Sequence, residues 1–421
     1  MKTPKQPEVN IGLVGHVDHG KTTLTQALTG EWTDRHSEEV KRGISIKLGY
    51  ADAVFYRCPT CPSPQRYSIQ EKCPHCGAQN EYLRSVSLVD APGHETLMAT
   101  MLSGAAIMNG AILLIAANEK CPQPQTREHL IALEIIGVKN VVVVQNKIDL
   151  MDKAGAVQNY NEISAFLKGT GFENVPVVPL SANHGVNVDA LIEALEQRIP
   201  TPPHEDNKPP FMYVARSFDI NRPGTPPSKL VGGVMGGSLL SGKFKVGDEI
   251  EIRPGPSSLE GGDGSGITTK IVSLVSGGRN LDELHPGGLA AIATTLDPAL
   301  TKSDGLTGRL VGLPGELPPL STRLLLKPTL LERVVGSSRD LRVEKIHTGE
   351  ILTLTIGTMI VAGKVTSART EEVEIRLTHP APVLPNARVA ISRRLNAWRL
   401  IGFGIVAGGS RPSSRQTAPP I

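Results

Sequence analysis

Short apolar runs recur along the first half of the chain, and amphipathic stretches separate them. The runs cover residues 9–14, 86–89, 111–116, 141–144 and 175–178 and are rich in valine, isoleucine, leucine and alanine. Runs of this length are typical of strands that are buried on both faces of a parallel sheet. The alternation therefore predicts an α/β domain with a mostly parallel, doubly wound sheet.

The clearest helical pattern covers residues 187–199. Its apolar positions share one face, and Asn187 stands where a residue could cap the first turn. A segment rich in proline and charge follows at 200–210 and reads as a linker. The first domain is therefore predicted to span 1–205, with its last helix directly before the linker.

Beyond the linker, apolar residues occupy every second position, as at 249–253, 352–356 and 373–377. This period indicates strands with one buried face. A second proline-rich segment lies near 318–322. The pattern predicts two β domains, at 206–322 and 323–411, and a disordered tail at 412–421.

Composition and charge narrow the class of protein. The formal net charge is only +3, so an RNA partner would have to bind a local basic patch. The longest apolar runs are too short to span a bilayer, and the N-terminal residues do not resemble a signal peptide. We expect a cytoplasmic protein with no membrane partner.

A phosphate-binding loop is predicted at GHVDHGKT, residues 15–22, between a predicted strand and a helix. Glycines let backbone N–H groups surround phosphate oxygens. The Lys21 ammonium suits the β- and γ-phosphates, and the Thr22 hydroxyl suits Mg²⁺. Taken alone, the segment could be a coincidental glycine-rich turn. The candidate nucleotide contacts here are Asp18, His19, Gly20, Lys21, Thr22 and Thr23.

Three more motifs follow predicted strands in the order that a guanine-nucleotide site requires. Asp90 can hold Mg²⁺ through water, and the Gly93 N–H can reach the γ-phosphate. Asp149 can accept hydrogen bonds from N1–H and the 2-amino group of guanine, which adenine lacks. The other candidate contacts are Asn146, Lys147, Ser181, Ala182 and Asn183. Open α/β sheets bind ligands at this edge, so the motifs together predict GTP or GDP as the ligand.

These motifs also carry a resemblance. GHVDHGKTT at 15–23, RGISI at 42–46 and DAPGHE at 90–95 resemble the elongation factor Tu group of translational GTPases. Within that group the chain is most similar to the γ subunit of translation initiation factor 2, in its archaeal form. The segments that carry this likeness are WTDRHSEE (32–39), IKLGY (46–50), MATMLSGA (98–105), PQPQTREH (122–129), RSFD (216–219), GGVMGGS (232–238) and LLERVVG (330–336).

The resemblance implies a GTPase domain followed by two β-barrels. We find no obvious arginine finger, since Arg35 and Arg42 are better interpreted as solvated charges, so intrinsic hydrolysis of GTP is expected to be slow. It implies a heterotrimer with α and β subunits that delivers initiator methionyl-tRNA to the small ribosomal subunit. Two alternatives stay open at this point. One is an elongation-type carrier of aminoacyl-tRNA, either general or specific for selenocysteine, and the other is a GTP-binding scaffold without turnover.

Roles for the switch residues follow only from the resemblance. Ser45 would offer its hydroxyl to Mg²⁺ at a position where most relatives carry threonine. His94 would position the attacking water, with Val17 and Ile44 as the apolar pair beside it. Asp18 either helps to hold the metal or serves as a structural carboxylate of the loop.

Four cysteines form two C-x-x-C pairs, Cys58 with Cys61 and Cys73 with Cys76. This spacing can place four thiolates around one tetrahedral zinc ion, which would be structural because sulfur fills every position. Four reduced cysteines are the alternative. The predicted zinc-binding insertion covers about residues 56–80. Cys121 stands apart.

A last candidate is the cluster of Arg388, Arg393, Arg394 and Arg399 with Trp398 nearby. Basic residues interleaved with apolar ones could form an RNA-facing edge. They could equally form a solvated face of a β-barrel.

Overall fold

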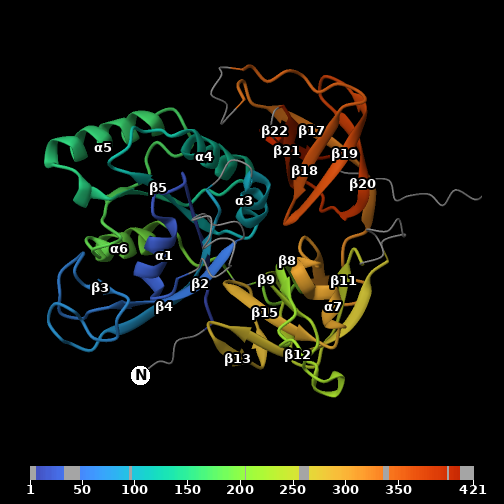
Figure 1. Cartoon of the computed structure of the whole chain (residues 1–421), viewed down its shortest axis with the longest axis horizontal. Helices are drawn as coiled ribbons and strands as arrows, with labels where there is room; N and C mark the ends of the chain where they lie inside the picture. Colours follow the sequence, from blue (N-terminus) through green and yellow to red (C-terminus); the bar gives the residue numbers. More distant parts are fainter. Residues whose placement is uncertain are drawn as a thin grey trace, which may run out of the picture.

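The computed structural model describes residues 6–32, 48–93, 97–203, 205–255, 265–334, 341–395 and 398–407. An α/β domain and two β-barrels surround a common centre (Figure 1). The predicted tail at 412–421 lies outside the described residues, as does most of the loop between β11 and β12. The predicted fold class, an α/β GTPase-type domain followed by two barrels, is confirmed.

The first domain is built on a sheet with strand order β3-β2-β4-β1-β5-β6-β7. Strand β1 lies between β4 and β5, and all pairings from β4 to β7 are parallel. Strands β2 and β3 extend the sheet antiparallel and were not predicted. The bounds are β1 Asn10–Gly15, β2 Gly49–Arg57, β3 Tyr67–Ser68, β4 Glu81–Asp90, β5 Gly110–Ala116, β6 Val141–Asn146 and β7 Val177–Pro179.

Helices cover both faces of this sheet, as the doubly wound pattern predicts. Leu24 of α1 and Leu191 of α6 belong to one buried cluster, whereas Met101 of α3, Leu130 of α4 and Ile163 of α5 belong to another. The helices are α1 Lys21–Thr29, α3 Met98–Ala105, α4 Pro124–Ile136, α5 Lys153–Leu167 and α6 Val188–Arg198, with a 3-10 turn at Ile148–Leu150.

The prediction that the Asn187 side chain caps the first turn of α6 is wrong. Asn187 precedes the helix, but its side chain makes no capping hydrogen bond and its φ is 61°. Its amide instead donates to the Pro179 carbonyl at 2.8 Å. The side chain therefore fixes the turn between β7 and α6 rather than the first helical N–H groups.

The second domain closes on itself because β11 pairs with both β16 and β12. The strand order is β11-β16-β8-β9-β15-β12-β13, and β10 pairs with β14 beside this ring. Its bounds are β8 Phe211–Phe218, β9 Val234–Ser241, β10 Phe244–Lys245, β11 Glu249–Arg253, β12 Ile267–Ser276, β13 Arg279–Leu281, β14 Glu283–Leu284, β15 Leu289–Thr294 and β16 Leu310–Gly312, with α7 at Pro298–Thr301 and 3-10 turns at Pro227–Lys229 and Lys302–Asp304.

The third domain is a closed barrel of order β17-β20-β19-β18-β21-β22. Alternate residues such as Leu352 and Leu354 fill its interior. This is the core that the period of two predicts. The bounds are β17 Leu320–Leu330, β18 Ile351–Ile356, β19 Met359–Ala368, β20 Val373–Pro382, β21 Arg388–Arg394 and β22 Trp398–Val406.

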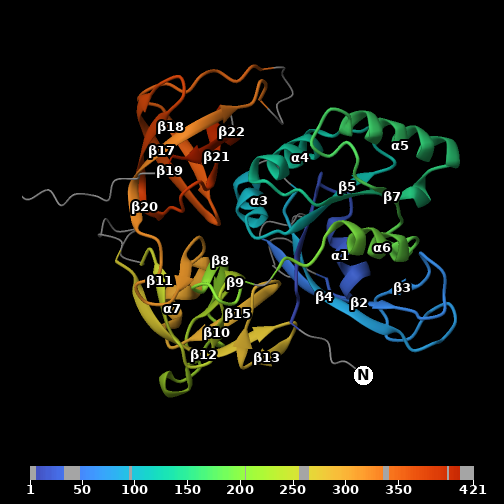
Figure 2. The same cartoon turned by 180° about the vertical axis from the view of Figure 1, so that it is seen from behind.

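The three domains pack tightly, and Figure 2 shows the same arrangement from behind. One apolar cluster includes Leu130 of the first domain, Ala215 of the second and Ala390 and Leu400 of the third. The packed faces are therefore continuous with the core of the α/β domain. Among the described residues, no helix is both long and apolar enough to cross a membrane.

Buried polar contacts fix the junction of the first two domains. The fully buried Asn10 amide donates to the Ile107 carbonyl at 2.9 Å, to Ser238 Oγ at 2.9 Å and to the Gly287 carbonyl at 3.1 Å. Ser87 Oγ accepts the Leu289 N–H at 2.9 Å. These side chains attach the neighbouring strands β1 and β4 to the second domain.

We expect Asn10→Ala to lower the free energy of unfolding by about 1–3 kcal/mol, because buried acceptors in two domains lose their donor. Calorimetric melting measures the effect. Asn161→Ala on the exposed face of α5 is the matched control and should change stability by less than about 0.5 kcal/mol. Equal melting of both variants would show that the Asn10 contacts do not hold the domains together.

Candidate nucleotide and metal sites

The predicted motifs meet at one edge of the sheet. Gly15 ends β1, Asp90 ends β4 and Asn146 ends β6, while Ser181 follows β7. These strands run parallel, so their carboxyl ends lie on the same side. A ligand at this edge would face all four motifs at once.

Two glycines shape the predicted phosphate loop. Gly15 and Gly20 have φ values of 148° and 94°, which L-residues with a side chain rarely adopt. A Cβ on Gly20 would also stand 2.5 Å from the Asn146 amide nitrogen. The loop therefore requires glycine at both positions.

Lys21 is buried behind this loop. Its Nζ donates to the Gly15 carbonyl at 3.1 Å and to the His16 carbonyl at 2.8 Å. Gly93, from the motif after β4, approaches the same ammonium so closely that a Cβ there would lie 2.5 Å from Nζ. The positive charge is thus held between the phosphate loop and the segment predicted to contact the γ-phosphate.

The predicted magnesium ligands Thr22 and Asp90 lie together. Thr22 Oγ1 donates to Asp90 Oδ2 at 2.9 Å, and Asp90 is almost fully buried. A hydroxyl and a carboxylate beside a phosphate site form the oxygen donor set that Mg²⁺ prefers. Asp18 is exposed with φ 61°, and Thr23 is half-buried on α1. The metal role of Asp18 stays a prediction.

Asn146 joins three segments of the site. Its amide donates to the His19 carbonyl at 2.9 Å, and its side-chain oxygen accepts the Ala182 N–H at 3.0 Å. This one side chain therefore holds the phosphate loop, the loop after β6 and the loop after β7 in register.

Asp149 faces the same space, and its carboxylate is 3.7 Å from His184 Nε2. The nearby Ser181 hydroxyl is the main cause that lowers the pKa of Asp149. The group is thus an anion at neutral pH, as acceptance of two guanine N–H bonds requires. Lys147 has a φ of 62°, and Asn183 is exposed.

Two buried histidines complete the surroundings of the phosphate loop. His19 Nδ1 lies 2.9 Å from the Leu114 carbonyl, and burial lowers its pKa to about 4. His129 of α4 accepts the Gly15 N–H at Nδ1 over 2.9 Å, and burial lowers its pKa to about 3. Sequence reasoning did not single out His129, although it ends the PQPQTREH segment.

Three predicted switch residues, Ile44, Ser45 and His94, lie outside the described residues. Val17, their predicted apolar neighbour, is half-buried in the phosphate loop. Their roles stay predictions.

The four cysteines converge at the end of the β2–β4 hairpin region. Their sulfur atoms lie within 4.8 Å of one another, with 3.5 Å between Cys58 and Cys76 and 3.6 Å between Cys61 and Cys73. Zinc–sulfur bonds of about 2.3 Å in a tetrahedron require sulfur–sulfur distances of about 3.8 Å. The donor set fits a structural zinc ion. Cys121 is buried elsewhere.

The structure places the members of the arginine cluster on β21 and β22 in different surroundings. Arg388 donates to the Glu134 and Ile135 carbonyls, Arg399 pairs with Glu128, and Arg393 pairs with Glu350. Arg394 is exposed at the end of β21. Arg393 and Arg399 are largely buried in ion pairs within the third domain or with α4, whereas Arg388 is exposed although it contacts α4. Binding of RNA by the cluster stays a prediction.

Comparison with known families agrees with this geometry. Residues 6–201 match the elongation factor Tu GTP binding domain, and residues 322–406 match the C-terminal domain of initiation factor eIF2 gamma. Translation initiation factor 2 subunit gamma of Archaeoglobus fulgidus is 60% identical over 401 residues, 95% of this chain and 94% of that protein. The subunit of Pyrococcus horikoshii is 58% identical over 405 residues, 96% of this chain and 98% of that protein.

Solved structures with the same fold include a bacterial selenocysteine-specific elongation factor, EF-Sec. It has a TM-score of 0.72 and 25% identity, and the match covers 95% of this chain but 58% of that one. Elongation factor SelB of Methanococcus maripaludis, in complex with a GTP analogue, has a TM-score of 0.70 and 20% identity, with 98% and 81% of the two chains covered.

We expect Asp149→Asn to weaken GTP binding by at least about 10-fold, because an amide cannot accept both guanine donors and leaves one of them unpaired. The same variant should gain relative affinity for xanthosine triphosphate, whose 2-oxo group can accept from the new amide. Competition with a fluorescent nucleotide measures both. Unchanged preference for guanine would remove Asp149 from the base site.

We expect the purified chain to hold about one zinc ion, and Cys73→Ser to lose it, because three thiolates bind zinc less well than four. Elemental analysis gives the stoichiometry, and thermal melting should show a lower midpoint in the variant. Cys121→Ser is the control and should keep the metal. If the wild-type protein holds no metal and Cys73→Ser melts at the same temperature as the wild type, the four cysteines are reduced thiols without a metal.

Proposed function

Because the chain belongs to the family of translation initiation factor 2 gamma subunits, we propose that it carries initiator methionyl-tRNA to the small ribosomal subunit in a GTP-dependent manner. The chain is a GTPase of translation initiation, and its family forms part of a multi-subunit factor. In our proposal it is the core of a heterotrimer with α and β subunits, and GTP hydrolysis releases the tRNA.

The observation that carries the proposal is the convergence of Lys21, the Thr22–Asp90 pair and Asn146 at one sheet edge. Together they offer a phosphate charge partner, an oxygen pair for Mg²⁺ and a linked guanine loop. In the proposed hydrolysis, Lys21 neutralises the β- and γ-phosphates and the Gly93 N–H contacts the γ-phosphate. Bound Mg²⁺ supplies charge neutralisation, and Thr22, Asp90 and Ser45 would hold it.

The attacking water is assigned to His94 on the family resemblance. The sequence offers no obvious arginine finger, so we propose slow intrinsic turnover. Slow turnover suits a switch, in which GTP orders two loops and its loss releases them.

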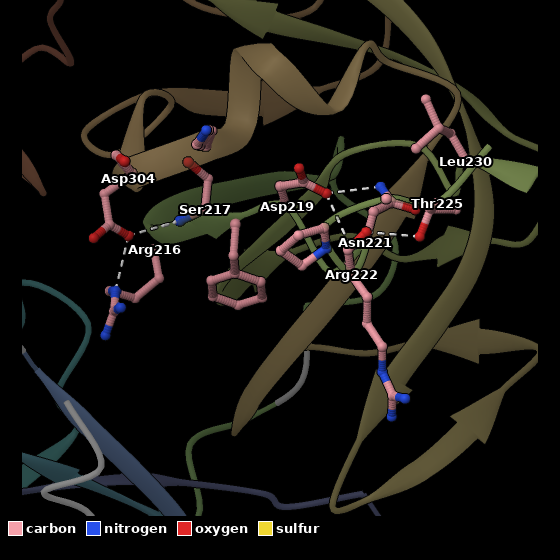
Figure 3. A pocket seen from close by; sticks show the side chains of 13 residues that line it. Arg216, Ser217, Asp219, Asn221, Arg222, Thr225, Leu230 and Asp304 are labelled. Atoms are coloured by element: carbon pink, nitrogen blue, oxygen red, sulfur yellow. Dashed lines mark hydrogen bonds and ion pairs between the residues drawn. The ribbon is translucent and has the colours of Figure 1, made fainter. Parts of the chain in front are cut away.

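A pocket of about 600 Å³ in the second domain is the proposed place for the charged end of the tRNA. Figure 3 shows Arg216, Arg222, Asp219 and Asp304 around it. Arg216 also donates to the Leu48 carbonyl of the first domain at 3.0 Å, two residues after the RGISI segment at 42–46, which contains the predicted switch residues Ile44 and Ser45. A nucleotide-dependent change in that segment would therefore reach the pocket wall.

The pocket has the chemistry of a polar ligand site. Arg222 and Lys302 are exposed on its rim, where they could contact phosphate or ribose oxygens. Ser303 and Asp304 have φ values of 55° and 65°, and strained residues of this kind cluster at ligand sites. Asp304 Oδ1 accepts from both Arg216 Nε, at 2.8 Å, and the Ser217 N–H, at 3.1 Å, which fixes the strained turn.

The proposal predicts selective binding of the initiator. Charged initiator and charged elongator methionyl-tRNA should be compared by filter binding, each with a non-hydrolysable GTP analogue and with GDP. Since both carry methionine, a preference for the initiator reports on the tRNA body, and we expect the preference to be larger with the analogue. Equal binding of the two would indicate an elongation-type carrier, and failure of both would overturn the carrier function for this chain.

The same assay tests the pocket. Combined Arg222→Ala and Lys302→Ala should weaken binding of the charged tRNA by about 10-fold or more, because two cations near the RNA backbone are lost. GDP affinity should not change. The control variant is Lys168→Ala, which removes an exposed cation at the end of α5 in the first domain, away from the pocket. It should not weaken tRNA binding. An equal effect of the control would place the acceptor end elsewhere.

A further inference from the structure

Helix α4 lies between the phosphate loop and the third domain (Figure 1). Two consecutive residues of this helix, Glu128 and His129, are each only 1% exposed. Their side chains contact different parts of the protein: His129 reaches the phosphate loop, and Glu128 reaches β22. One helical turn thus attaches the nucleotide site to a domain that the chain adds some two hundred residues later.

The contact with the phosphate loop is specific. His129 Nδ1 accepts the Gly15 N–H at 2.9 Å, while Lys21 Nζ donates to the carbonyl of the same Gly15 at 3.1 Å. Both polar groups of this residue are thereby fixed from opposite sides. The imidazole must be neutral to accept this bond, and burial together with the neighbouring Lys21, His16 and His19 lowers its pKa to about 3.

The contact with the third domain is also buried. Arg399 Nη1 lies 3.2 Å from Glu128 Oε1, and the two side chains are 13% and 1% exposed. Farther along the helix, Arg388 Nη1 donates to the Glu134 carbonyl at 3.2 Å and the Ile135 carbonyl at 3.1 Å. A cation at the carboxyl end of a helix is favourable because the last carbonyls lack helical partners.

We propose that α4 couples the docking of the third domain to nucleotide binding, with His129 as a positioning residue for Gly15 and the Glu128–Arg399 pair as the anchor. When the third domain is docked, the anchor fixes the turn that carries His129, and the Gly15 N–H stays aligned with its acceptor. When the anchor is lost, the turn gains freedom and the phosphate loop loses a constraint. The inference concerns nucleotide affinity and does not rest on the identity of the cargo.

Coupling of this kind is reciprocal, so bound nucleotide must also strengthen the docking of the third domain. Proximity alone does not establish coupling, and a double-mutant cycle is the direct measure. The cycle uses the full chain with a fluorescent GDP analogue and compares the wild type, Arg399→Met, His129→Ala and the double variant.

We expect each single variant to weaken GDP binding by about 5-fold, the low end of measured allosteric coupling. The double variant should be no weaker than His129→Ala, because without the imidazole the anchor has nothing to transmit. His129→Asn, whose side-chain oxygen can replace Nδ1 as the acceptor, should restore most of the affinity. The rise in melting temperature on adding GDP should be smaller in Arg399→Met, which a purely structural role of Arg399 would not require.

Arg394→Met is the matched control, since Arg394 is exposed at the end of β21 and should leave GDP affinity unchanged. If Arg399→Met does not yield folded protein, Glu128→Gln removes the charge with almost no change in shape and should give the same loss. Unchanged GDP affinity in the folded anchor variant would overturn the proposal. So would additive losses in the double variant, because they would mean that Arg399 and His129 act independently.

Discussion

A phosphate cradle made of backbone N–H groups is only as well ordered as the contacts that hold that backbone. Among the described residues, side chains of α1, α4 and β6 hold it. Lys21 of α1 donates to the carbonyls of Gly15 and His16. His129 of α4 accepts the Gly15 N–H, and Asn146 of β6 donates to the His19 carbonyl. The loop is therefore preorganised, and each holder ties it to another part of the molecule.

The arrangement of the domains follows from those ties. Asn146 also accepts the Ala182 N–H and so connects the phosphate loop to the loop after β7. Helix α4 packs against the third domain through one apolar cluster that includes Leu130, Ala390 and Leu400. Asn10, on the strand that leads into the loop, joins the second domain. The strand that presents the phosphate loop is thus attached to both barrels, directly at its beginning and through α4 at its end.

The sequence predicted the parts of the site that depend on short spacings. Each of these motifs is a short contiguous segment, so the residues that carry its chemistry are close together in the sequence. They are the loop at 15–22, the motifs after β4 and β6, and the C-x-x-C pairs. The strands of the parallel sheet were equally visible, because both of their faces are buried. Strand β2 was missed because its buried and half-exposed residues are mixed, as expected at the side of the sheet where pairing becomes antiparallel.

Partners far apart in the chain were out of reach. Arg399 and Glu128 are separated by 271 residues, and Gly15 and His129 by 114. An arginine in a strand looks the same in sequence whether it faces water, RNA or a buried carboxylate. Only the docking of the third domain against α4 decides among these, which is why the pairing of Arg399 with Glu128 could not be predicted.

The buried Glu128–Arg399 pair has a consequence for how the domains fit. Removing two charges from water costs several kcal/mol, so such a pair adds little net stability compared with apolar residues of the same size. Breaking it by removal of one partner is nevertheless costly, because the remaining charge stays buried. The pair therefore penalises every docking position in which Arg399 misses Glu128. An apolar contact alone would tolerate sliding, whereas this pair selects one register of β22 on α4, and that register is the one in which His129 meets Gly15.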